Sequence, residues 1–429
     1  MKFFNPKQLI YFYNFIWTLI TPLIPILLIF RLIIGKEEIS RIKERFGYSS
    51  IKMKKRGEKL VWLHAASLGE VVSATSLAIG LREAGFKGIV LITSGTITSS
   101  FFLKEYEDII HQYHPLDKKT WVNRFLKFWE PDILIMAESE IWPNFIICTK
   151  SMKIPIIMAS AQISDNSFKR MTKIGFNNTA FLFSHIDLIF TTDINQTKKF
   201  RLMGAKKVST SQSLKVSMPP KLPNKNLIKK FQNISLHRTI ILAASTREHE
   251  EEILINCVNK LNQGGFKVLL IIAPRHIKRS NKISKLNNLK IKIKSKNEFP
   301  NMDDEFWISD TYGEMPTLYS LSEIVFVGGS LHPYGGHNPS EACHYNTSIV
   351  IGPHTEKCQK VVDQMKNEQA IIQLNSNSID ELTEIFEKIL SNNDFKNDFK
   401  NASFLLTKEW TNERNKLAQN VVKNFNLIN

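Results

Sequence analysis

Two carboxylate-bearing segments in the first half of the chain have the residue types and spacing for acid–base chemistry. Glu70 closes the segment HAASLGE, which follows the apolar run Leu60–His64 and enters a predicted helix. Glu138 and Glu140 follow a second apolar run, Ile133–Ala137. Carboxylates at neighbouring strand ends can share a cleft, where burial and like charge raise a carboxyl pKa toward neutrality and create a general base. A structural role for Glu70 stays open, because a glutamate in a first helical turn usually complements the helix dipole.

The second half of the chain carries residues suited to binding a phosphate. Arg275 follows a strand-like run, and its guanidinium group could bind phosphate in bidentate fashion, although an ordinary surface arginine is the alternative. The glycine-rich segment 335–341 predicts a helix start, with Asn338 as N-cap, Pro339 in the first turn and Glu341 closing a capping box. This device explains these residues structurally, yet a helix start beside flexible glycines is also a usual site for a nucleotide phosphate.

Elements that could position these residues recur along the whole body of the chain. Short runs rich in Val, Ile and Leu alternate with longer amphipathic stretches, which predicts βαβ units and parallel sheets. Strands are expected at 60–64, 89–93, 133–137, 154–159 and 188–192, and again at 240–244, 268–273, 324–327, 349–352 and 370–374. The fold class is therefore α/β, with two doubly wound domains. Ligands of such sheets bind beyond the carboxyl ends of the strands.

A proline- and lysine-rich break separates the two series of strands and resembles an interdomain linker. The expected organisation is a membrane segment at 1–35, a first Rossmann-like domain at 36–215, the linker at 216–226, a second Rossmann-like domain at 227–405 and a C-terminal helix at 406–429.

The N-terminal segment is a candidate for crossing a membrane. Residues 9–30 carry no charge, and 22 residues at about 1.5 Å each could cross a hydrocarbon core of about 30 Å. More basic residues follow the segment than precede it, which places the body of the protein in the cytoplasm. Pro22, Pro25 and Asn14 leave open a segment that lies in the interface or bends into a hairpin.

Composition narrows the classes of partner, and the absence of several sequence motifs disfavours three classes of enzyme. Lys and Arg exceed Asp and Glu by 17 among 429 residues, which favours anionic partners, although nucleotide bias in the genome could also produce this excess. The four cysteines form no CxxC pair, so neither a disulfide framework nor a zinc cluster is indicated. No Walker A, GxGxxG or HExxH motif is present, which disfavours an NTPase, a dinucleotide-dependent dehydrogenase and a zinc protease.

Six ordered motifs make the chain resemble the 3-deoxy-manno-octulosonic acid (Kdo) transferases of lipopolysaccharide synthesis. They are HAASLGE ending at 70, ESEIWPN from 138, ASTREHEEE from 244, PRH from 274, DTYGEM from 310, and FVGGS to GGHNPSEA ending at 342. The resemblance extends from the N-terminal segment to about residue 365. It implies a GT-B fold of two Rossmann-like domains facing each other across a cleft, with the acceptor site in the first domain and CMP-Kdo in the second.

The resemblance also implies residue roles and partners. Glu70 would be the general base, and Glu138 and Lys215 would stabilise the transition state. The positions that match CMP contacts are Pro274, Arg275, Gly313, Glu314, Met315, Asn338, Pro339, Ser340 and Glu341. The implied reaction is an inverting single displacement with no metal and no cofactor. Its acceptor would be the lipid A precursor (lipid IV-A), with inner-membrane lipids as further partners at the cytoplasmic face of a bacterial inner membrane.

Two rival functions stay open from the sequence. Another GT-B enzyme that uses a UDP-sugar, such as an N-acetylglucosaminyltransferase or an epimerase, would share the same arrangement of elements. A basic, membrane-tethered nucleic-acid-binding protein would share the charge, but the chain has no helix-turn-helix, zinc finger or aromatic RNA-binding motif. We therefore expect no nucleic-acid partner.

Overall fold

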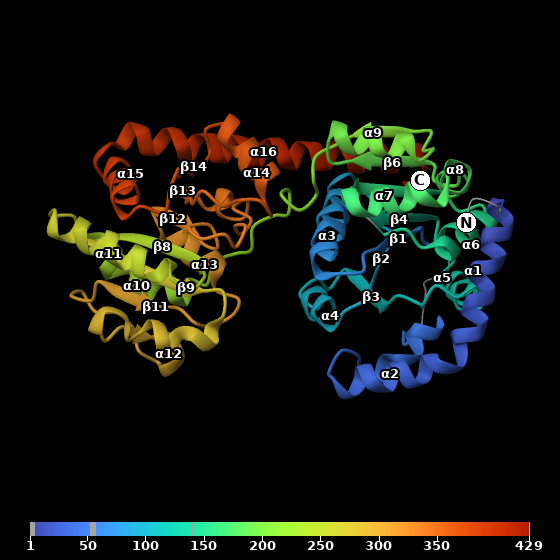
Figure 1. Ribbon diagram of the computed structural model, residues 1–429, viewed down its shortest axis with the longest axis horizontal. Coiled ribbons are helices and arrows are strands. Elements are labelled where there is room, and N and C mark those ends of the chain that lie inside the picture. Colours follow the sequence, from blue (N-terminus) through green and yellow to red (C-terminus); the bar gives the residue numbers. More distant parts are fainter. Residues whose placement is uncertain (1–4, 52–56, 139, 429) are drawn as a thin grey trace. The chain divides into compact units, whose positions relative to one another are not determined.

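The computed structural model describes residues 5–51, 57–138 and 140–428, which divide into two compact units. Unit 1 comprises Met1–Met218 together with Trp410–Asn429, and unit 2 comprises Pro219–Glu409. Within the described residues, each unit contains a seven-stranded parallel sheet, and Figure 1 shows helices packed on both faces of each sheet. The expected α/β class with two Rossmann-like domains is confirmed.

The sheet of unit 1 has the strand order β3-β2-β1-β4-β5-β6-β7. Its strands are β1 (Leu60–His64), β2 (Ile89–Ser94), β3 (Ile109–Tyr113), β4 (Ile133–Ala137), β5 (Ile156–Ala161), β6 (Leu188–Thr191) and β7 (Val208–Thr210). Its helices are α1 (Pro6–Ile20), α2 (Ile24–Ile33), α3 (Leu68–Glu83), α4 (Ile97–Leu103), α5 (Lys119–Trp129), α6 (Pro143–Ser151), α7 (Asp165–Ile174), α8 (Phe176–Phe183) and α9 (Ile194–Leu202). The order reverses between β1 and β4, which is where a doubly wound sheet binds its ligand.

The sheet of unit 2 has the strand order β10-β11-β9-β8-β12-β13-β14. Its strands are β8 (Thr239–Thr246), β9 (Val268–Pro274), β10 (Lys292–Ile293), β11 (Phe306–Ile308), β12 (Ile324–Val327), β13 (Ser348–Ile351) and β14 (Ile372–Gln373). Its helices are α10 (Lys225–His237), α11 (Glu250–Gln263), α12 (Ser280–Ile283), α13 (Met315–Leu321), α14 (Gln359–Asn367), α15 (Ile379–Ser391) and the start of α16 (Asn393–Asn424). Here the order reverses between β8 and β12.

The central strands form because they are apolar on both faces. All five residues of β1 and of β4 are buried, as expected for parallel strands covered by helices on each side. The terminal helix α16 begins in unit 2 and ends in unit 1, where Leu417, Ala418 and Val421 join the core. The final 20 residues of the chain therefore belong to the first unit.

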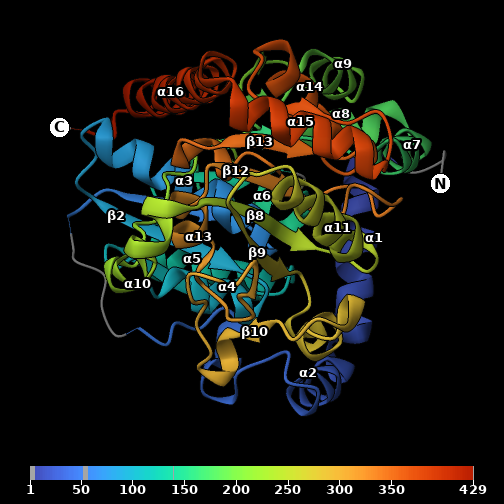
Figure 2. The ribbon, with the colours of Figure 1, turned by 90° about the vertical axis from the view of Figure 1, so that its left-hand side faces the viewer.

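Among the described residues, one stretch, Pro6–Ile33, is long and apolar enough to cross a membrane if it were straight. It is not one straight helix, because a 3-10 turn at Thr21–Leu23 separates α1 from α2. Figures 1 and 2, which are views at 90° to each other, show the two helices running in different directions.

Candidate active site

Glu70 lies in the first turn of α3, directly beyond the carboxyl end of β1. Its Oε2 atom accepts hydrogen bonds from the backbone N–H groups of Ala66 at 2.7 Å and Ser67 at 3.0 Å, which closes a capping box with Ser67 as N-cap. Burial raises the pKa of the Glu70 carboxyl, and the two backbone hydrogen bonds offset part of this rise. Both backbone donors bind the same oxygen, so Oε1 remains for a different partner.

Glu138 lies directly beyond β4, the strand that neighbours β1 at the reversal of strand order. Its backbone adopts a left-handed conformation, with φ of 57°. The Oε1 atom accepts a hydrogen bond from Ser73 Oγ and forms an ion pair with Lys215 Nζ, each at 2.9 Å. Its Oε2 atom accepts a hydrogen bond from Gln162 Nε2 at 2.9 Å. Because Ser73 lies on α3, these contacts hold Glu138 against the helix that carries Glu70.

Lys215 reaches Glu138 from a turn after β7. The turn is held by a hydrogen bond of 2.8 Å from the Leu214 backbone N–H to Ser160 Oγ. A Cβ atom at Gly69 would lie 3.3 Å from Lys215 Nζ, so the glycine leaves room for the ammonium group. The structure thus brings together Glu70, Glu138 and Lys215 within unit 1.

Glu140 joins Glu70, Glu138 and Lys215 as a fourth member of this group of side chains, which we call the acidic pocket. The sequence singled out Glu140 only as part of an acidic cluster. Its carboxylate accepts a hydrogen bond from the indole N–H of Trp142. Burial, followed by the neighbouring Glu70 and Glu138 carboxylates, raises the pKa of Glu140 to about 7. Its spacing two residues after Glu138 was the available signal, but only the fold shows that both side chains face Glu70. Ser139, between them, lies outside the described residues.

A buried histidine borders the acidic pocket. His64 Nδ1 and Thr93 Oγ1 are 2.9 Å apart, and His64 Nε2 lies 3.9 Å from Glu140 Oε2. Burial holds the pKa of His64 well below its usual range, and the nearby His114 lowers it further. A neutral imidazole therefore lies beside the carboxyl groups, which leaves Lys215 as their cationic neighbour.

In unit 2, cationic side chains gather at the carboxyl ends of β8 and β9. Arg275 is exposed directly after β9, and Arg247 lies directly after β8, with one guanidinium nitrogen 3.0 Å from His276 Nε2. The pKa of His337 is lowered to about 4. The largest cause is burial, and the next causes are the nearby groups Arg275, Arg247, Lys357 and His276, in that order. These groups converge, because each of them repels a proton on the same imidazole. We call Arg247, Arg275, His276, His337 and Lys357 the basic cluster.

Two buried nitrogen atoms of the basic cluster are unsatisfied. Within the described part of the chain, Arg247 Nε and His337 Nε2 are buried and have no hydrogen-bond partner. Buried polar atoms are normally paired, so an anionic ligand at this place would satisfy a real deficit. Of the cluster, sequence analysis assigned only Arg275 to a site. The position of Arg247 at a strand end was the signal that could have identified it.

The glycine-rich turn after β12 is occupied by a carboxylate of the protein. Glu250, which is fully buried, accepts hydrogen bonds from the backbone N–H groups of Gly329, Ser330 and Leu331 at 2.7 to 2.9 Å. A Cβ atom at Gly328 would lie 2.7 Å from the Cα of Thr246, so only glycine fits there. The hydrogen bonds from these N–H groups to Glu250 therefore hold the turn in place.

Gly313, Glu314 and Met315 form a second pinned turn, after β11. Gly313 has a positive φ of 84°, and Met315 begins α13. The Glu314 carboxylate accepts hydrogen bonds from Ser309 Oγ at 3.0 Å and Thr311 Oγ1 at 2.6 Å, and it forms an ion pair with Lys294. Because β11 pairs with β9, this turn lies at the same sheet edge as Pro274, the last residue of β9.

The predicted helix start at 338–341 is wrong. Asn338 Oδ1 accepts a hydrogen bond from the Ser340 N–H two residues later, which forms a turn. Only a short 3-10 helix, Ala342–Tyr345, follows before β13. No capping box forms there. Pro339 and Ser340 are buried, whereas Asn338 and Glu341 are exposed.

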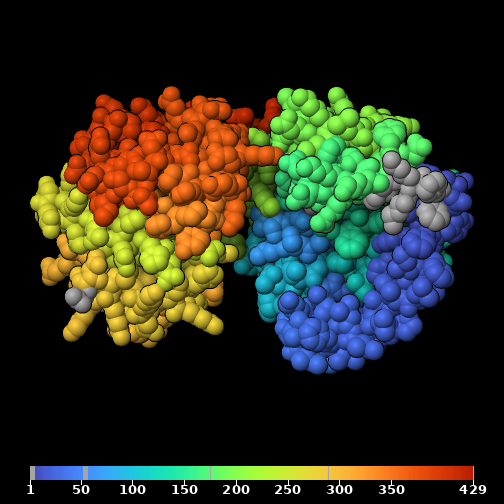
Figure 3. All heavy atoms as spheres, in the orientation of Figure 1, coloured from blue at the N-terminus to red at the C-terminus, as the bar shows by residue number. Residues whose placement is uncertain are grey.

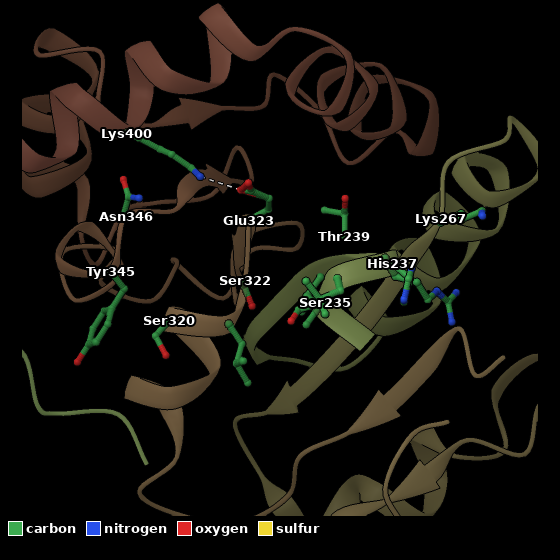
Figure 4. A pocket seen from close by; sticks show the side chains of 14 residues that line it. Ser235, His237, Thr239, Lys267, Ser320, Ser322, Glu323, Tyr345, Asn346 and Lys400 are labelled. Carbon is green, nitrogen blue, oxygen red and sulfur yellow. Dashed lines mark hydrogen bonds and ion pairs between the residues drawn. The ribbon is translucent and has the colours of Figure 1, made fainter. Parts of the chain in front are cut away.

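A cavity of about 680 Å³ in unit 2 lies away from all these residues (Figure 4). It is lined by the first residues of β8 and by Glu323, which precedes β12, so it lies at the amino ends of the strands. Lys400 and Glu323 form an ion pair of 2.7 Å within it. None of the predicted site residues lines this cavity.

Among the residues that the structure describes, no group of three or more His, Cys, Asp and Glu side chains is arranged to hold a metal ion. The carboxyl groups of unit 1 are instead engaged by N–H groups, hydroxyl groups and Lys215.

Comparisons with known proteins link the sequence to one family. The model of the 3-deoxy-D-manno-octulosonic-acid transferase (kdotransferase) family matches residues 40–218. A 3-deoxy-D-manno-octulosonic acid transferase of Rickettsia bellii is 31% identical over 391 residues, covering 89% of this chain and 91% of the relative. A protein of the same name from Haemophilus influenzae is 30% identical, covering 80% of this chain and 82% of the relative.

The fold of this chain is similar to that of a solved glycosyltransferase structure. A glycosyltransferase from Rickettsia africae has a TM-score of 0.57 and 14% identity, covering 86% of this chain and 99% of that chain. This likeness concerns the fold alone, and it confirms the expected GT-B class of two Rossmann-like units. The similarity in sequence to the two relatives extends through both units.

Proposed function

Because this chain belongs to the 3-deoxy-D-manno-octulosonic acid transferases, a family of glycosyltransferases, we propose that it transfers Kdo from CMP-Kdo to the lipid A precursor lipid IV-A. The observation that carries the proposal is the convergence of Glu70, Glu138 and Lys215 beyond β1 and β4. Sheets of this kind bind ligands at that reversal of strand order.

Glu70 is the proposed general base. Its Oε1 atom takes the proton of an acceptor hydroxyl while the oxygen of that hydroxyl attacks the anomeric carbon of Kdo. The bond from that carbon to the phosphate oxygen breaks, and CMP leaves with the bonding electrons. One displacement inverts the anomeric configuration. The raised pKa of the Glu70 carboxyl supports this role, because it makes the carboxylate a stronger base than usual.

Glu138 and Lys215 are proposed to support the transfer without accepting the proton. The ion pair between them fixes the ammonium group of Lys215 beside α3, where Gly69 leaves space for it. A fixed cation stabilises negative charge that develops during the reaction, typically by a few kcal/mol. Glu140 is the acidic neighbour of Glu70, and the Glu70 carboxylate helps to raise the pKa of Glu140.

The donor site is proposed at the strand ends of unit 2. Arg275 and the rest of the basic cluster would neutralise the phosphate of CMP, which gains charge as the leaving group. The remaining proposed CMP contacts are Pro274, Gly313, Glu314, Met315, Asn338, Pro339, Ser340 and Glu341. Those at 313–315 belong to a turn at the same sheet edge as β9.

A glutamine at position 70 separates the structural role of this residue from its proposed chemical role. Glutamine can also close a capping box, so Glu70→Gln should retain the fold. It cannot act as a base, so transfer from CMP-Kdo should fall by about 10²- to 10⁴-fold. The measurement is the initial rate of CMP release with the lipid acceptor present.

Glu381 offers a matched control. Its carboxylate also accepts backbone hydrogen bonds before a helix, from Asn375 at 2.8 Å and Ser376 at 3.0 Å, but it lies on α15 in unit 2. Glu381→Gln should transfer Kdo at nearly the normal rate. Near-normal transfer by Glu70→Gln would remove Glu70 from the mechanism, whatever the control shows.

A further inference from the structure

The N-terminal segment is bent into two arms, and neither arm is long enough to cross a bilayer. We call residues 6–33 the N-terminal elbow. Its arms have 15 and 10 residues, joined at a 3-10 turn that contains Pro22 and is followed by Pro25. At about 1.5 Å per residue the arms are about 22 and 15 Å long, against a hydrocarbon core of about 30 Å.

Polar contacts hold the first arm against the body of unit 1. The Tyr13 hydroxyl donates to Asp117 Oδ2 at 2.8 Å, and Asn144 Nδ2 donates to Asn14 Oδ1 at 3.1 Å. Burial raises the pKa of the Asp117 carboxyl to about 7, even though backbone N–H groups of α6 also bind it. Detaching α1 from the body would remove one of the hydrogen-bond donors to this buried carboxyl.

Apolar contacts hold the bend and the second arm. Ile24 and Leu28 are buried in a cluster with Trp121, and Trp17 meets the Trp121 ring edge to face at 6.1 Å. At the bend, Lys118 Nζ donates to Thr21 Oγ1 at 2.8 Å. Both arms are thus docked on unit 1, and the blue N-terminal residues in Figure 3 form a continuous ridge along its surface.

The outer face of the elbow is apolar and exposed. Only 11% of its most apolar window is buried, so the elbow is not a core helix. The large apolar side chains that are exposed on it are Tyr11, Phe12, Phe15, Ile16, Leu19, Leu23, Ile26, Leu27, Ile29, Phe30 and Ile33. A continuous apolar surface of this kind needs a covering partner. Exposed lysines flank it in the sequence, namely Lys7 near its start and Lys36 three residues after its end.

We propose that the N-terminal elbow lies in the plane of one leaflet of an anionic phospholipid membrane and does not cross it. The outer face then sits among the acyl chains, and the flanking lysines meet the phosphate groups of the lipids. A spanning arrangement would require α1 to leave Asp117 and Asn144, and it would require the bend to straighten. The start of α1 and the body of unit 1 therefore lie on the same side of the membrane.

The elbow also adjoins the start of α6, the helix that follows the acidic residues, through Asp117 and Asn144. Asp117 accepts hydrogen bonds from the backbone N–H groups of Asn144 and Phe145, at the start of the helix that follows Glu140 and Trp142. A lipid acceptor anchored in the same leaflet would be presented close to the acidic pocket. This consequence rests on the proposed function, whereas the membrane topology does not.

Cysteine labelling distinguishes the two topologies in the full-length protein. Lys7→Cys and Lys36→Cys place thiols at exposed positions in the first turn of the elbow and just after its end, and Lys260→Cys marks the body of the protein. The four native cysteines are buried, so the unchanged protein measures the background. In sealed membrane vesicles of known orientation, a membrane-impermeant maleimide should label all three variants from the same side.

Two outcomes would overturn the in-plane topology. One is labelling of Lys7→Cys from the side opposite to Lys260→Cys. The other is failure of Lys7→Cys to label from either side while Lys260→Cys is labelled. Labelling reports topology and not catalysis, so a failed transfer assay would leave this result intact.

A pair of substitutions tests whether lipid is the partner of the outer face. Leu23→Glu combined with Ile26→Glu places charges at positions that are 60% and 65% exposed, so the fold should persist. Flotation with vesicles of phosphatidylethanolamine and phosphatidylglycerol should fall at least fivefold, because two carboxylates would have to enter the apolar layer. Leu202→Glu, at a position 64% exposed on α9, should float normally. Unchanged flotation of the double variant would contradict a lipid partner. If the two substitutions instead changed the oligomeric state without reducing flotation, the outer face would bind a second copy of the chain and not lipid.

Discussion

At the scale of single residues, the protonation of the acidic pocket of unit 1 depends on burial and on the charges of neighbouring carboxyl groups. The pKa of Glu140 is raised to about 7 by burial and by Glu70, and burial also raises the pKa of Glu70. Interacting carboxyl groups titrate as a pair, so the protonation of one depends on the charge of the other. Lys215 opposes this effect by favouring ionised Glu70.

Replacing Glu140 should move the pH dependence of transfer. The proposed mechanism requires ionised Glu70, so kcat/KM should fall as the pH decreases through the raised pKa of the pair. In Glu140→Gln the negative charge beside Glu70 is absent, so the pKa of Glu70 should drop and activity should persist to lower pH by about 0.5 to 1 unit. The measurement is a pH profile of kcat/KM. An acid limb that stays in place or moves to higher pH would show that the two carboxyl groups are not coupled.

Arg247 should contribute to donor binding. It lies at the end of β8 with a buried Nε atom that has no partner within the described residues. Hydrogen bonds to charged groups contribute about 1.5 to 3 kcal/mol, so Arg247→Ala should weaken CMP binding by roughly 10- to 100-fold. Thermal unfolding with increasing CMP measures this loss, and UMP should protect the unchanged protein much less.

Lys260→Ala controls for the loss of one positive charge from the same unit, because Lys260 lies near the other end of α11 and pairs with Asp380. Equal protection by CMP in Arg247→Ala and Lys260→Ala would place the phosphate elsewhere.

At the scale of elements, both units place their candidate residues at the carboxyl ends of their strands. In unit 1 these are β1 and β4, where the strand order reverses, and in unit 2 they are β8 and β12, at the reversal, together with β9 and β11. The turn after β12 is fixed by Glu250, the first residue of α11, which binds four backbone N–H groups at 2.7 to 2.9 Å. This carboxylate therefore ties the end of β8 to the end of β12.

Removing the Glu250 carboxylate should destabilise unit 2. Glu250→Ala leaves buried N–H groups without an acceptor, so the free energy of unfolding should fall by about 2 to 4 kcal/mol. Thermal or urea unfolding measures this change. Glu252→Ala, in the same helical turn but exposed, should change stability by less than about 0.5 kcal/mol. Similar losses in the two variants would mean that helix-dipole effects, and not the turn, account for the stability.

Much of the element scale was predictable from the sequence. The strands at 60–64, 133–137 and 324–327 were predicted at their observed bounds, because they are uninterrupted apolar runs. The edge strands β3, β7 and β10 and the inner strand β11 were missed, since β3 carries polar residues and the others have only two or three residues. The start of a helix at Asn338 was predicted wrongly, because a residue pattern cannot show that its side chain bonds to the N–H of Ser340.

The candidate site was only partly predictable. The strand-end rule identified Glu70, Glu138 and Arg275, since each follows a recognisable strand directly. The turn that brings Lys215 to Glu138 depends on a hydrogen bond to Ser160, which is 54 residues before Leu214. Lys357 joins His337 in the same way, through contacts that no local pattern encodes.

At the scale of the whole molecule, the proposed chemistry is divided between the two units. Unit 1 holds the carboxyl groups and the N-terminal elbow, and unit 2 holds the basic cluster. The chain returns to unit 1 through α16, where buried Arg414 pairs with Glu83 at 2.6 Å and donates to the Ser217 carbonyl oxygen. The sequence indicated a terminal helix but not which unit it completes, because an amphipathic pattern does not name its partner.

The most direct test of the proposed reaction is the mass of its lipid product. Purified full-length protein is incubated with CMP-Kdo and tetraacylated lipid A precursor, and the lipid is then weighed by mass spectrometry. We expect the lipid to gain the mass of one or more Kdo residues while CMP is released, and we expect no gain when a UDP-sugar replaces CMP-Kdo. An acceptor of unchanged mass with CMP-Kdo, from protein that still binds CMP, would contradict the proposed transfer.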